Sequence, residues 1–95
     1  MSELKPRPVH PGEILREEFL VEYDLSAGAL ANALHVPRDR IEKLVRETRA
    51  ITADTAARLA KYFGTTPQFW MNLQSNYDLA LVDERELSEV ERRVA

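Results

Sequence analysis

Residues 25–47, LSAGALANALHVPRDRIEKLVRE, decide the fold. They contain two short helical patterns, about 27–34 and 37–46, which are separated by the break His35-Val36-Pro37. The first pattern is rich in alanine, so a second helix can approach it closely at Ala31. In the second pattern, apolar residues share one face of the helix and most of the basic side chains lie on its other faces. A short helix, a tight turn and a basic second helix are typical of a helix-turn-helix motif.

Helical patterns continue on both sides of this motif. Upstream, apolar spacing predicts a first helix over about 12–23. Downstream, Thr52 as N-cap and Gly64 as C′ residue predict a fourth helix over 53–63. A fifth helix begins at Thr66-Pro67 and continues to about residue 81, with large aromatic side chains at helical spacing. Since no stretch has strand alternation, we expect an all-α, five-helix domain with a helical C-terminal extension.

Length and composition are those of one small globular domain of 95 residues, 44% hydrophobic and 31% charged. We expect residues 1–9 to form a flexible N-terminal arm, 10–82 the helix-turn-helix domain and 83–95 a charged C-terminal tail. The chain has no cysteine and only two histidines, far apart in sequence, so neither a metal site nor a cofactor is expected. It has no recognisable signal peptide or membrane span, which predicts a soluble, cytoplasmic protein without membrane contact.

Charge is unevenly distributed along the chain, although the net charge is only −3. Residues 12–24 carry five acidic side chains and one arginine, whereas residues 35–50 carry five basic and three acidic side chains. An acidic protein with one basic segment can still bind DNA through that surface. The acidic stretch is either a solvated helix face or a docking site for a basic partner. The N-terminal arm and the C-terminal tail are alternative docking sites for such a partner.

The basic side chains of the second helix in the motif are candidate DNA contacts, with a solvated helix face as the alternative. Arginine can grip guanine through two hydrogen bonds, so Arg38 and Arg40 are expected at base edges or phosphates. Ser26 is expected to cap the N-terminus of the first helix of the motif, at about 27–34. The free backbone N–H groups at that end suit a phosphate. The full candidate set is Ser26, Pro37, Arg38, Arg40, Lys43, Arg46 and Arg49.

The aromatic residues of the fifth helix have two interpretations. Aromatic side chains are enriched in subunit interfaces, and this helix follows a complete small core. We therefore expect Trp70, Tyr77 and Leu81 at a dimer interface, with core packing as the alternative for Trp70. For Phe69, core packing is the preferred interpretation.

Four segments together resemble a known family. They are HPGEIL at 10–15, the motif at 25–47, RAITADTAARLAKYFGTTPQFWMNLQ at 49–74 and YDL at 77–79. They resemble the Cro/repressor-type helix-turn-helix proteins, and more closely the HigA (VapI-like) antitoxins, over about residues 9–80. The resemblance implies a five-helix Cro/repressor-like domain, a homodimer that binds double-stranded operator DNA and represses its own operon, and neutralisation of a RelE-like mRNA-cleaving toxin.

Three positions depart from the family pattern. Ala27 stands where such motifs often carry a glutamine that touches phosphate. His35 occupies the usual turn glycine, although histidine tolerates a left-handed backbone better than most residues. Arg46-Glu47 replaces the Asn-Gly that commonly ends the recognition helix.

Other function classes receive less support from the sequence. There is no Gly-rich phosphate loop, no GxSxG and no HExxH, and we expect no enzymatic activity. Ser26, His35 and Asp39 could be drawn as a triad, but they flank a turn without an evident pocket. The remaining alternatives are a solitary helix-turn-helix transcriptional regulator without a toxin, and a module that only sequesters a partner.

Overall fold

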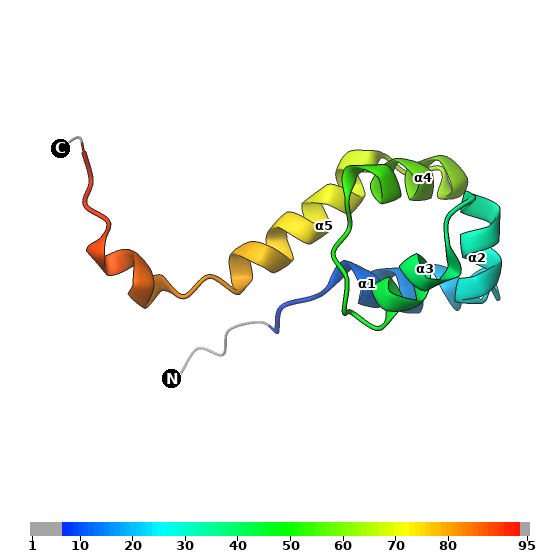
Figure 1. Ribbon diagram of the computed structural model, residues 1–95, viewed down its shortest axis with the longest axis horizontal. Coiled ribbons are helices and arrows are strands. Elements are labelled where there is room, and N and C mark those ends of the chain that lie inside the picture. Colours follow the sequence, from blue (N-terminus) through cyan, green and yellow to red (C-terminus); the bar gives the residue numbers. More distant parts are fainter. Residues whose placement is uncertain (1–6, 94–95) are drawn as a thin grey trace.

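The computed structural model describes residues 7–93 and is built from helices (Figure 1). Its α-helices are α1 (Pro11–Ile14), α2 (Ala27–Leu34), α3 (Arg38–Val45), α4 (Ala53–Phe63) and α5 (Pro67–Ala80). A π-helical segment, η1 (Leu15–Leu20), continues α1, and a 3₁₀ helix, η2 (Glu84–Glu89), follows α5. No strand occurs among the described residues, and the predicted all-α class is confirmed. Residues 1–6 of the predicted arm lie outside the described residues.

The helices begin and end close to the residues that capping chemistry predicts. Ser26, Thr52 and Thr66 precede α2, α4 and α5, and each side-chain oxygen accepts the backbone N–H three residues later. Gly64 ends α4 in the left-handed conformation, with φ of 74°. Pro37 is the extended N-cap residue of α3, with ψ of 141°, and not its first helical residue as expected.

The first helix differs from the regular α-helix predicted over 12–23. It starts at Pro11 and becomes π-helical from Leu15, with the Val21 N–H donating to the Arg16 carbonyl five residues earlier. A turn over 21–24 then ends it. Apolar spacing shows which face of a helix is buried, but it does not show which carbonyl each N–H selects. The π-helical segment was therefore missed.

Trp70 lies in the core. It is fully buried, its indole N–H donates to Thr65 Oγ1 at 2.8 Å, and its ring centroid is 5.0 Å from that of Phe19. We therefore remove Trp70 from the predicted dimer interface, because a side chain without exposed surface cannot reach a second subunit. Phe69, expected in the core, is 38% exposed. The other large side chains with almost no exposed surface include Leu15, Leu30, Ile41, Leu44 and Leu59.

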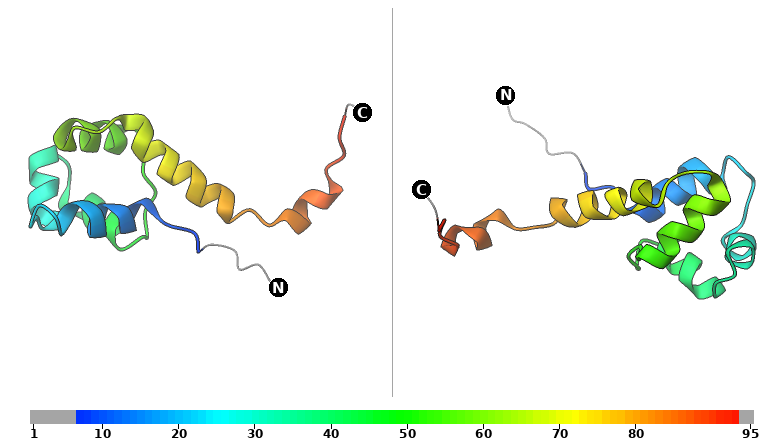
Figure 2. Two further views of the ribbon diagram at one scale, coloured as in Figure 1. Left: turned by 180° about the vertical axis from the view of Figure 1, so that it is seen from behind. Right: turned by 90° about the horizontal axis from the view of Figure 1, so that it is seen from above.

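The C-terminal half of α5 projects away from the other helices, and η2 lies further out still (Figures 1 and 2). The radius of gyration is 16.4 Å, whereas a compact chain of this length has about 13 Å. Large apolar side chains are exposed along this projection, namely Leu79, Leu81, Val82, Leu87 and Val90. The projection therefore carries half of the exposed large apolar side chains of residues 7–93. None of the helices in that range is long and apolar enough to cross a membrane.

Candidate nucleic-acid interface

Helices α2 and α3 form the helix-turn-helix unit. Between them His35, which stands at the family's usual turn glycine, adopts the left-handed conformation with φ of 59° and ψ of 44°. The Val36 N–H then donates to the Ala31 carbonyl at 3.1 Å, which closes the end of α2. Ala31 itself is buried, as the close crossing of two helices requires. The turn therefore forms without glycine, because histidine is among the residues that tolerate this conformation.

Helix α3 buries one face and exposes basic side chains on the other. Ile41 and Leu44 belong to the core. The side chains of Arg38, Lys43 and Arg46 are about half exposed or more. These three cations are therefore accessible to a ligand that approaches α3 from solvent.

Acidic neighbours on the same helix hold these cations in place. Glu42 accepts from Arg38 Nε at 2.7 Å and lies 3.8 Å from an Arg46 nitrogen. Asp39 lies 3.2 Å from Lys43 Nζ. Exposed pairs of this kind stabilise a helix by only about 0.3–0.5 kcal/mol each, so a phosphate or a base edge can replace them at small cost.

Arg40 is held differently from the other three cations. Its side chain is only 25% exposed, and Nη1 donates to the carboxylate of Asp54 in α4 at 2.6 Å. Asp54 also accepts from Arg58 Nε at 3.0 Å, and Arg58 Nη1 donates to the Leu34 carbonyl at 2.8 Å. Hydrogen bonds from Arg40 and Arg58 hold the pKa of the Asp54 carboxyl below its usual range. Arg40 therefore ties α3 to α4 and must leave Asp54 to reach a ligand.

Of the remaining predicted residues, Ser26 and Pro37 lie at the starts of α2 and α3, and Arg49 lies beyond the end of α3. Ser26 and Pro37 are exposed N-cap residues, and Arg49 is exposed in the loop after α3. A methyl group built on Gly28 would lie 3.2 Å from Arg38 Nε, so the start of α2 lies against the start of α3. The α2 N-terminus, whose first N–H groups have no intrahelical acceptor, therefore shares a surface with Arg38.

The sequence analysis missed Gln74, a buried residue of α5. Its Oε1 accepts the backbone N–H of Ile51 at 2.7 Å, and its Nε2 donates to Asp78. Gln74 thus fixes the loop that leads from α3 to α4. The only signal was its place at the end of the segment GTTPQFWMNLQ, where it interrupts an apolar face.

Comparison with known proteins identifies the family. A helix-turn-helix family model matches residues 15–70. Virulence-associated protein I of Dichelobacter nodosus is 58% identical over 76 residues, which are 80% of this chain and 70% of that protein. Antitoxin HigA-1 of Vibrio cholerae is 40% identical over 79 residues, 83% of this chain and 74% of its own. The chain belongs to the HigA (VapI-like) family of helix-turn-helix antitoxins.

A solved structure supports this assignment over almost the whole chain. The Pseudomonas aeruginosa antitoxin HigA, determined with the higBA promoter, matches this HigA-family chain with a TM-score of 0.88 and 49% identity. The match covers 94% of this chain and all of that one. The Cro/repressor-like helix-turn-helix fold expected from the sequence is thereby confirmed.

Proposed function

We propose that this HigA-family chain is a DNA-binding antitoxin that represses its own operon and neutralises a RelE-like mRNA-cleaving toxin. One observation carries the proposal: α3 and its C-cap expose Arg38, Lys43 and Arg46, and Arg38 lies beside the open N-terminus of α2. Similarity to an antitoxin determined with promoter DNA supports it.

DNA binding would place α3 in the major groove. Arg38 and Arg46 are the residues proposed to read base edges, since a bidentate contact to guanine contributes about 1–3 kcal/mol of discrimination. Lys43 and Arg49 are proposed to contact phosphates, which position the protein without reading sequence. Arg40 is proposed to contact DNA only after it leaves Asp54.

The start of α2 would hold a second phosphate. Ser26 uses its hydroxyl oxygen to cap the Ala29 N–H, so the N–H groups of Ala27 and Gly28 remain available to an anion. Ala27 offers no side-chain contact where related motifs often have a glutamine, so this contact is made by backbone alone. Pro37 is proposed to pack against the DNA backbone at the start of α3.

We further propose a homodimer held by the projecting end of α5. Residues 7–9, the C-terminal half of α5 and the start of η2 line a groove of about 860 Å³ that includes Val9, Tyr77 and Leu87. Tyr77 in this groove and the exposed Leu81 at the end of α5 are proposed to contact a second copy, so that two motifs meet half-sites about 34 Å apart. Leu81→Glu should give a monomer in analytical ultracentrifugation, while Val21→Glu, at an even more exposed position outside the projection, should leave the dimer intact. A dimer in both variants would contradict this interface.

Two experiments test the proposed function. Fluorescence anisotropy with the DNA upstream of the gene should give tighter binding than a scrambled duplex, and the affinity should fall steeply between about 50 and 200 mM salt. Co-expression with the neighbouring reading frame should yield a stable complex and relieve growth arrest. Specific DNA binding without such a neighbour would indicate a solitary regulator, and a complex without DNA binding would indicate sequestration alone.

A further inference from the structure

The C-terminal end of α3 closes in a way that usually requires glycine. The Thr48 N–H donates to the Lys43 carbonyl and the Glu47 N–H to the Leu44 carbonyl, both at 2.9 Å, which is the Schellman arrangement. The residue at the left-handed position of this arrangement is Glu47, with φ of 66°. This conformation is strained for any residue that has a Cβ, so glycine would fit better here by backbone energy alone.

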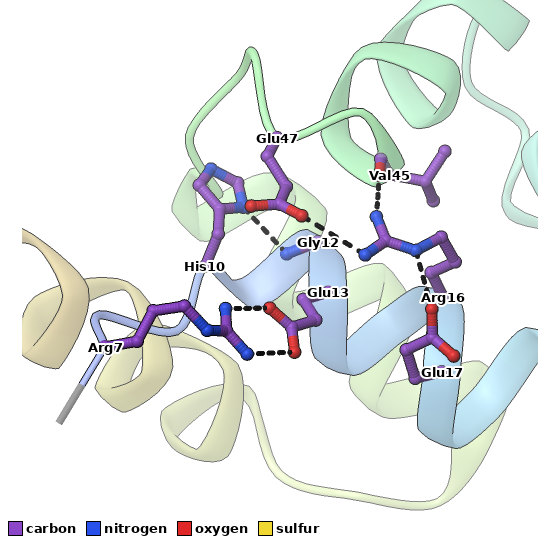
Figure 3. A network of polar contacts seen from close by, with 8 residues as sticks. All are labelled: Arg7, His10, Gly12, Glu13, Arg16, Glu17, Val45 and Glu47. Atoms are coloured by element: carbon purple, nitrogen blue, oxygen red, sulfur yellow. Dashed lines mark hydrogen bonds and ion pairs between the residues drawn. The ribbon is translucent and has the colours of Figure 1, made fainter.

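Arg16 of η1 contacts both the last carbonyl of α3 and the side chain of Glu47 (Figure 3). Its Nη1 donates to the carbonyl of Val45, the last residue of α3, and its Nη2 donates to the Glu47 carboxylate at 3.2 Å. Its Nε donates to Glu17 on its own helix at 2.9 Å. A single guanidinium therefore binds the end of α3 at two points, 29 and 31 residues away in sequence.

A second contact joins the first helix to the same end of α3. A methyl group built on Gly12 would overlap the Leu44 carbonyl oxygen, so the two backbones touch with no side chain between them. His10 fixes Gly12 by accepting its N–H at 2.8 Å (Figure 3). The first helix thus meets α3 through the carbonyls of Leu44 and Val45, both in its last turn.

We propose that Arg16 and Glu47 are positioning residues that set the direction in which α3 presents its basic face. The inference rests on the proposed role of α3 in binding DNA. Stability alone does not account for the pair. Both side chains are more than one third exposed, and an exposed ion pair stabilises a fold little. Glu47 also adds strain and places a negative charge at the wrong end of the helix dipole. In return, its carboxylate gives Arg16 a second attachment to α3.

The variant Glu47→Gly separates positioning from stability. It removes the strained side chain, so the midpoint of thermal unfolding should equal or exceed that of the wild type. It also removes a negative charge near the DNA, which by electrostatics alone would strengthen binding. We nevertheless expect the ratio of affinities for the upstream and scrambled duplexes to fall about tenfold, a loss that charge cannot explain.

Arg16→Lys, which keeps the charge but loses the two-nitrogen geometry that meets both acceptors, should give a similar fall. Glu17→Gln, which removes only the negative charge that pairs with Arg16 within η1, should leave the ratio unchanged.

Amide hydrogen exchange tests the contact without DNA. The Thr48 amide should exchange about tenfold faster in Arg16→Lys than in the wild type, while amides in α4 keep their protection. Unchanged exchange at Thr48 in Arg16→Lys would overturn the proposal. Faster exchange with an unaltered affinity ratio would also overturn it, since the pair would then be only structural. Failure of the wild type to prefer upstream DNA would instead refute the proposed function, and the exchange data would still decide whether Arg16 holds α3.

Discussion

Gly12→Ala tests how closely the first helix approaches α3. In the wild type, a methyl group at this position would overlap the Leu44 carbonyl oxygen and lie 2.8 Å from its carbonyl carbon. Carbon atoms in contact are normally about 3.5–4.0 Å apart, so one helix must move by about 1 Å. Overpacking of this kind costs about 1–3 kcal/mol, and we expect the upper end because the obstacle is backbone.

The measurement is the midpoint of thermal unfolding by circular dichroism at fixed protein concentration. A loss near 3 kcal/mol should lower the midpoint by about 12–24 °C for a domain of this size. Gly28→Ala is the matched control, because its methyl group would meet only the flexible side chain of Arg38, at 3.2 Å or more. Its helix propensity should leave the midpoint unchanged or slightly higher. Equal midpoints for the two alanine variants would refute the close contact between Gly12 and Leu44.

Two further predictions concern buried polar groups. Gln74→Met keeps the side-chain volume but leaves the buried Ile51 N–H without its acceptor. The free energy of unfolding, measured by chemical denaturation, should fall by about 1–3 kcal/mol. The control Gln68→Met, on the exposed face of α5, should lower it by less than about 0.5 kcal/mol. Equal losses would show that the Ile51 contact does not matter. Burial lowers the pKa of His10, so as the pH falls below about 6.5 the unfolded chain takes up protons first and stability is lost. The midpoint of thermal unfolding should therefore decrease as the pH is lowered from about 7.5 to 5.5. His10→Asn, which can still accept the Gly12 N–H, should show a smaller decrease. An equally large decrease in this variant would assign the effect to other groups.

Much of the fold follows from local chemistry that is visible in the sequence. Helix ends are marked by Ser26, Thr52, Thr66 and Gly64. The three hydroxyl side chains each accept a backbone N–H three residues later, and Gly64 readily adopts the left-handed conformation that ends a helix. Such features depend on neighbours along the chain, so a single sequence is sufficient to place them.

Features that depend on distant residues could not be predicted in this way. Arg40 looks like the other cations of α3 in sequence, but Asp54, fourteen residues later, holds it against α4. The spacing of Trp70 in the sequence fits an interface residue as well as a core residue. Only its packing against Phe19 shows that it belongs to the core. Glu47 marked a departure from the family pattern, yet its partner Arg16 lies 31 residues away.

The central claim is that the exposed cations of α3 read the DNA upstream of this gene. The most direct test is the affinity of Arg38→Ala/Arg46→Ala for that DNA and for a scrambled duplex, measured by fluorescence anisotropy, with Arg85→Ala as a control that removes a cation outside the motif. The account predicts a loss of about 50-fold or more on upstream DNA, a much smaller loss on the scrambled duplex and nearly unchanged affinities for the control. Losses of equal size on both duplexes, or no loss at all, would contradict it.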